Sequence, residues 1–144
     1  MNYPLMMPPF NVNFEEMKRK EAQNHFDWFI SQVPERMNIL NKYSNVDLDF
    51  SPKSLVELWE YFIPLIQLVD LSPLQEEEIS KNVPDGLRKV LLNKMNRNGL
   101  TTETSAISLD IATYFGEYFL RNHHQIKWGF VTKPRSLFYR TLYQ

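Results

Sequence analysis

Apolar positions recur with a helical period over most of the chain. Between residues 14 and 43 they return every three to five residues, as on one face of an amphipathic helix. Asn13 precedes this stripe and is a candidate N-cap, so the helix is predicted to begin near it. Because proline lacks a backbone donor, Pro34 predicts either a kinked helix or two abutting helices.

A second helix has the clearest local signal in the sequence. Ser51 is a good N-cap and Pro52 is preorganised for the first helical position, and an apolar helical face follows them. Phe50 and Leu55 have the spacing of a hydrophobic staple across this cap. Pro64 predicts that the helix is kinked or ends there.

Three more helices are predicted further along the chain. Residues 74–80 and 84–95 are predicted to form two short helices, and residues 103–122 a longer one. The longer helix is apolar over most of its circumference, which predicts a central position in the fold. Gly116 costs this helix up to about 1 kcal/mol relative to Ala. A close crossing with another helix is the expected compensation, and a ligand near the backbone is the alternative.

The period changes after this helix. Residues 126–132 alternate in the manner of a strand, residues 133–136 have the composition of a turn, and residues 137–143 favour a second strand. The second strand would form either an edge of the fold or a pairing surface for another copy of the chain. The prediction is an α+β fold, predominantly α, with four to five helices around a central C-terminal helix and a C-terminal β-hairpin.

One domain is predicted. Residues 1–12 contain three prolines and are predicted to be an irregular N-terminal arm, and residues 13–144 a single globular domain. Hydrophobic residues make up 43% of the chain and aromatic residues 14%, which is enough for a substantial core. No basic-flanked leader and no run near the ~18 apolar residues of a membrane span is visible. A cytoplasmic protein without membrane association is therefore expected.

Charge is distributed unevenly although the formal net charge is only −1. Residues 47–78 hold eight acidic residues and one basic residue, whereas residues 118–144 hold five basic residues and no acidic one. Two solvated surfaces that attract each other within the fold are the first interpretation. A basic docking face is the second.

The predicted final helix contains the polar side chains that could line a ligand cleft. Asp110 and Glu117 lie two turns apart, about 10 Å by helix rise, which is wide for carboxylates that share a proton. We expect them to be satisfied structurally, by the basic hairpin, and the alternative is an enzyme or small-ligand binder with a cleft near these two residues. The candidate cleft residues are Asp110, Gly116, Glu117 and Arg121.

The sequence lacks the motifs of common catalytic and cofactor sites. There is no cysteine, which excludes disulfides and thiolate metal ligands. The histidines His25, His123 and His124 have no third ligand at a recognisable spacing, and glycine is too scarce for a phosphate loop. No catalytic residue, no metal and no cofactor is therefore predicted.

The remaining prediction is a non-enzymatic protein-interaction module, because aromatic and arginine side chains are common interface anchors. The hairpin is the candidate interface, and the acidic residues 70–78 are the second choice. The candidate residues are Trp128, Phe130, Arg135, Phe138, Tyr139, Arg140 and Tyr143. Another protein is the expected partner, and a homo-oligomer through the C-terminal strand is an alternative. The same side chains could stack on single-stranded nucleic acid, but the absence of net positive charge argues against that.

Two segments carry a resemblance to known proteins. Residues 48–59, and residues 110–119 with the following Trp128-Gly129-Phe130, resemble a pattern in small uncharacterised bacterial proteins. These are broadly similar in size and layout to polymorphic-toxin immunity proteins. The resemblance spans roughly half the chain and its motifs are structural. It implies a bacterial or phage cytosolic protein, and it assigns no functional residue.

Overall fold

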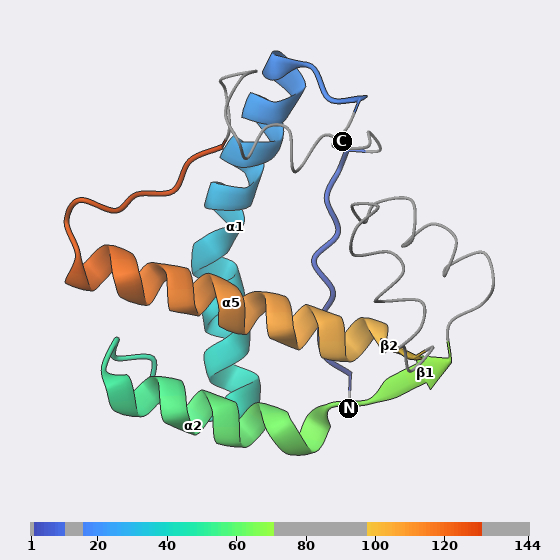
Figure 1. Ribbon diagram of the computed structural model, residues 1–144, viewed down its shortest axis with the longest axis vertical. Helices are drawn as coiled ribbons and strands as arrows, with labels where there is room; N and C mark the ends of the chain where they lie inside the picture. The colour runs from blue at the N-terminus through green and yellow to red at the C-terminus, as the bar shows by residue number, and fades with distance from the viewer. Residues whose placement is uncertain (1, 11–15, 71–97, 131–144) are drawn as a thin grey trace, which may run out of the picture.

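The computed structural model describes residues 2–10, 16–70 and 98–130, and this part of the chain is mainly helical (Figure 1). Its elements, in chain order, are α1 (Arg19–Ser44), α2 (Pro52–Phe62), the 3₁₀ turn η2 (Ile63–Leu65), β1 (Leu68–Asp70), β2 (Asn98–Leu100) and α5 (Thr102–Asn122). Helices α2 and α5 run antiparallel beside each other, and α1 crosses behind α5 at a steep angle (Figure 1).

Helices α2 and α5 begin at side-chain hydroxyl caps. The hydroxyl of Ser51 accepts a hydrogen bond from the backbone N–H of Ser54 at 3.2 Å, and Pro52 is the first residue of α2. Thr101 caps α5 in the same way through the N–H of Thr104. The predicted cap of α2 and the predicted extent of the last helix are therefore confirmed. Pro64 lies in η2, directly after α2 ends.

Helix α1 differs from its prediction in its first residue and in its course at Pro34. It begins at Arg19, where the side chain of Glu21 accepts from the backbone N–H of Lys18 at 2.7 Å, so a start near Asn13 is wrong. It also continues as one helix through Pro34, which excludes two abutting helices. Its C-cap is Asn45, which adopts the left-handed conformation common at helix C-termini, with φ 55°.

The predicted set of four to five helices with a C-terminal hairpin is wrong for the described residues. These contain three α-helices, and their two strands are β1 and β2, which pair antiparallel with Val69 opposite Gly99. Residues 126–130, expected to begin the hairpin, are irregular. The alternating aromatic residues here pack against α1 instead of forming a sheet face: Trp128 lies 5.5 Å from Phe29, and Phe130 5.4 Å from Phe26, between ring centroids. The predicted helices 74–80 and 84–95 and the strand 137–143 lie outside the described residues.

The core joins the three helices in two adjoining clusters. Leu40, Leu58 and Tyr114 form the centre of one, and each has no exposed surface. Phe62 and Ile107 belong to the other cluster, which also contains Tyr3 from the N-terminal arm. Within the described residues α5 contacts α1, α2 and β2, so it is the element around which the others pack.

Candidate functional site

Asp110, the first predicted cleft residue, is part of the core and not of a cleft. Its carboxylate is 1% exposed and accepts two hydrogen bonds from Arg36, from Nε at 2.9 Å and from a terminal nitrogen at 2.7 Å. Tyr3 donates a third hydrogen bond at 2.6 Å. The partner of Asp110 is therefore an arginine of α1, and not the C-terminal basic segment that the sequence suggested.

The N-terminal arm completes this buried network. Arg36 donates to the carbonyl of Pro4 at 2.8 Å, and the backbone N–H of Tyr3 donates to Glu103 at 2.7 Å. The pKa of the Tyr3 hydroxyl is raised well above its usual range. Burial is the larger cause, and the hydrogen bond to Asp110 is the second. The hydroxyl thus stays protonated and serves as a donor, so this cluster joins the N-terminal arm to α1 and α5.

The other predicted cleft residues take part in separate contacts. The indole N–H of Trp128 donates to Glu117 at 2.7 Å, and its ring lies so close to Gly116 that an added Cβ would overlap it. The close approach at Gly116 is therefore made by one side chain, and not by a crossing helix. The Arg121 guanidinium lies 4.2 Å from the ring centroid of Phe50. The four residues do not surround a common space.

The predicted interface is described only at its first two members. Trp128 and Phe130 are half-buried and turn inward onto α5 and α1. The remaining candidates, Arg135, Phe138, Tyr139, Arg140 and Tyr143, lie outside the described residues. Trp128 and Phe130 therefore do not provide exposed anchors.

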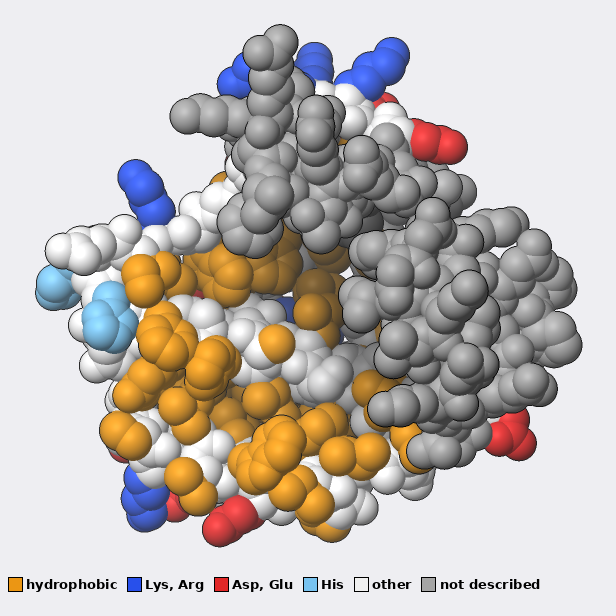
Figure 2. Space-filling model, viewed as in Figure 1, with side chains coloured by type: hydrophobic (Ala, Val, Ile, Leu, Met, Phe, Trp, Pro, Cys, Tyr) orange, Lys and Arg blue, Asp and Glu red, His pale blue; other side chains and the backbone are white. Residues whose placement is uncertain are grey.

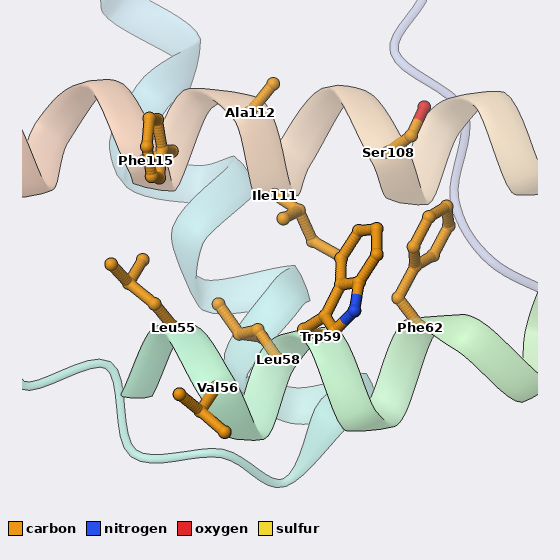
Figure 3. Close-up of a pocket in the computed structure, with 9 residues that line it drawn as sticks. All are labelled: Leu55, Val56, Leu58, Trp59, Phe62, Ser108, Ile111, Ala112 and Phe115. Carbon is orange, nitrogen blue, oxygen red and sulfur yellow. The ribbon is translucent and has the colours of Figure 1, made fainter. Parts of the chain in front are cut away.

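The structure instead shows an apolar groove between α2 and α5 with a volume of about 550 Å³ (Figure 3). We call it the α2–α5 groove. All of its lining residues except Ser108 are apolar. They are Leu55, Val56, Leu58, Trp59, Phe62, Ser108, Ile111, Ala112 and Phe115.

The groove is open to solvent along its length. Trp59 is 55% exposed, Val56 57% and Phe115 49%, although all three are large apolar side chains. On this face of the molecule apolar side chains gather over α2 and α5 into one patch (Figure 2). Monomeric proteins expose isolated apolar residues routinely, but a contiguous concave patch indicates a binding surface.

Helical geometry explains why the groove exists. On α2, Leu58 and Phe62 fill the core, while Trp59 and Val56 extend the apolar stripe toward solvent. On α5, Ile111 points toward α2 and Phe115 lies one turn further along the same side (Figure 3). The stripes are wider than the buried contact between the two helices requires, and the excess lines the groove.

Sequence reasoning missed this site. The broad apolar circumference of residues 103–122 predicts a central position for this helix, but it does not reveal that Leu109 and Phe115 are both more than two-fifths exposed. The available signal was the width of the apolar stripes on residues 52–62 and 102–122. When two such helices pack together, only part of each stripe is buried, and the rest stays exposed.

The chemistry of the groove is limited to apolar contact and a few hydrogen bonds. The hydroxyl of Ser108 already donates to the carbonyl of Ser105 at 2.8 Å. No acidic, basic or histidine side chain lines it. Elsewhere in the described ranges, no three His, Asp or Glu side chains converge as a metal site.

Comparisons with family models, curated proteins and solved structures return no match to this chain. Within the described ranges, none of the helices has the length and apolar character needed to cross a bilayer. The site is therefore interpreted from its own geometry.

Proposed function

We propose that the chain is a non-enzymatic protein-interaction module that binds another protein through the α2–α5 groove. The observation that carries this proposal is the exposure of Trp59, Val56 and Phe115 along one concave apolar surface. Exposed aromatic side chains beside a pocket are typical anchors of binding energy, because their burial removes a large apolar area from water.

The state of the polar residues supports binding over catalysis. Asp110 is paired with Arg36 and Tyr3, and Glu117 accepts from Trp128, so neither carboxylate faces the groove with a free oxygen. An immunity-like or regulatory role in a bacterial cytoplasm is the specific form of this proposal that the resemblance suggests.

Site-specific photocrosslinking tests the proposal. A benzophenone amino acid would replace Val56, Trp59 or Phe115 in the full-length chain expressed in a bacterial cell, and irradiation would be followed by mass spectrometry. Met7, which is 76% exposed on the N-terminal arm and does not line the groove, is the matched control position. We expect all three groove positions to crosslink to the same protein and the control position not to do so.

Two outcomes would contradict the proposal. Adducts at the groove positions that do not differ from those at Met7 would show that the groove is not a preferred contact surface. Crosslinking of the groove only to a second copy of the chain would show that self-association, and not another protein, covers it.

A further inference from the structure

We infer that the occupant of the α2–α5 groove is an amphipathic α-helix of the partner protein that carries Lys or Arg on the flank beside α2. This inference rests on the proposed function and adds the chemistry of the partner.

The shape of the groove suits a helix. Leu55, Leu58 and Ile111 point into the space between two antiparallel helices (Figure 3). Val56 and Ala112 line its two outer edges, so a third helix can rest across the groove as in a helical bundle. The 11 residues of α2 correspond to about 16 Å, or about three turns of a docked helix. A helix satisfies its own backbone hydrogen bonds, so it can enter a groove whose walls are helices. An added strand would find no strand edge among the lining residues.

The charge of the groove walls is one-sided. Glu60 is exposed and lies one turn after Val56, on the outer side of α2. Asp47 and Asp49 are exposed just before α2 begins. Two bases lie near this wall: Lys53, which forms a 3.1 Å ion pair with Glu57, and Arg121 of α5, whose guanidinium lies over Phe50 just before α2. The α2 wall therefore has an excess of negative charge, which favours a basic flank on the occupant.

The α5 wall is uncharged along its outer side. Its exposed or half-buried residues there are Ser105, Ser108, Leu109 and Ala112. Three of these are small, so the backbone of a docked helix can approach closely. The expected occupant thus has its apolar face in the groove, basic residues toward α2 and small or uncharged residues toward α5.

The same charge distribution disfavours a second copy of this chain. In a two-fold symmetric contact through the groove, the α2 wall would meet either the same acidic wall of the other copy or its uncharged α5 wall, depending on the direction of the axis. Neither arrangement places basic side chains beside the acidic α2 wall, so the geometry points to a different protein that carries the opposite charge.

Two designed peptides test the inference against the full-length chain. Both are amphipathic helices with identical leucines at positions i, i+3, i+4 and i+7. One has lysines on its flank and the other has glutamates at the same positions. Fluorescence anisotropy of the labelled peptides at low salt is expected to show the lysine peptide binding about tenfold more tightly. This preference should shrink as salt screens the charges.

Matched variants of the protein locate the effect. Glu60→Lys is expected to remove most of the preference for the lysine peptide. Glu35→Lys makes the same charge change at an exposed position of α1 that does not line the groove, so it should shift the preference much less. Val56→Glu is expected to weaken binding of both peptides, because it introduces a charge into the apolar surface.

The outcomes separate this inference from the proposed function. Equal binding of both peptides, lost in Val56→Glu, would overturn the basic flank and leave the groove as a docking surface. A lack of binding by either peptide, or binding that Val56→Glu leaves unchanged, would count against the groove itself. Concentration-dependent dimerisation that Val56→Glu abolishes would assign the groove to a second copy and overturn the inference.

Discussion

Asp110 is a buried carboxylate whose partners come from two distant parts of the chain. Arg36 lies 74 residues before it and Tyr3 lies 107 residues before it, yet both contact the carboxylate oxygens. A buried ion pair costs desolvation of both charges, so its contribution depends on complete hydrogen bonding. The N-terminal arm supplies part of that bonding through Tyr3 and Pro4.

Removing the Tyr3 hydroxyl should therefore destabilise the fold. Tyr3→Phe keeps the ring and deletes one hydrogen bond to a buried charge, with an expected loss of about 1.5–3 kcal/mol in the free energy of unfolding. Urea denaturation measures this loss. Tyr43→Phe is the matched control, because its hydroxyl donates to the carbonyl of Asn2 at an exposed site, and a smaller loss is expected there. Equal losses in the two variants would show that the buried hydrogen bond contributes no more to the free energy of unfolding than the exposed one.

The raised pKa of Tyr3 also predicts a pH dependence. The unfolded tyrosine ionises near its ordinary value of 10.0, whereas the folded one stays protonated at higher pH. The unfolded state therefore loses its proton first, so the contribution of Tyr3 to stability is complete below pH 10 and declines as the pH rises above it. Urea midpoints measured across this range should fall more steeply for the natural chain than for Tyr3→Phe. Parallel curves would contradict the prediction.

At the scale of elements, residues 123–130 lead from the end of α5 toward the N-terminal half of α1, and Trp128 contacts both helices (Figure 1). The indole ring covers Gly116, and its N–H donates to Glu117 one residue further along the helix. The ring of Phe29 of α1 packs edge-on against the ring of Trp128, so the segment joins α5 to α1. Glycine costs the helix stability at this position, and the packing of Trp128 offsets the cost.

Gly116→Ala should consequently reverse the usual effect of such a change. In an exposed helix it would stabilise by up to about 1 kcal/mol, but here the methyl group would displace the Trp128 ring. We expect a lower melting temperature and a red shift of tryptophan emission. Gly129→Ala is the control, since nothing lies within 4 Å of an added Cβ there, and the emission should stay unchanged. A stabilised Gly116→Ala variant with unchanged emission would show that Trp128 does not rest on this glycine.

The same elements show what sequence patterns can and cannot establish. The cap at Ser51 and the extent of α5 follow from residues adjacent in sequence, and both were predicted correctly. The alternation at residues 126–130 fits a sheet face or aromatic packing against helices equally well. Only the position of Phe26 and Phe29, about a hundred residues earlier, decides between them.

The site was harder to predict than the helices. Because Asp110 lies within an apolar stripe, its carboxylate is expected to pair with another side chain inside the fold. No residue near it in sequence identifies Arg36 as that partner. The groove was missed because an exposed apolar position has the same sequence signature as a buried one. Val56 and Leu58 are both apolar residues of one helix, yet the first is 57% exposed and the second is fully buried.

At the scale of the whole molecule, the two sides of α5 differ in character within the described part of the chain. The α2–α5 groove leaves apolar surface exposed to solvent on one face (Figure 2). The buried network of Asp110 lies on the other side of α5, where the N-terminal arm and α1 cover it. The polar residues thus maintain the fold, and the apolar excess forms the surface that we propose for binding.

The most direct test of this account is the affinity of the crosslinked partner for the natural chain and for Val56→Glu. Because Val56 is largely exposed, the variant should keep its melting temperature, while a charge within the docking surface should weaken binding about a hundredfold. Leu5→Glu, at an exposed position of the N-terminal arm, should leave the affinity unchanged. Equal affinity of the natural chain and Val56→Glu would contradict the account.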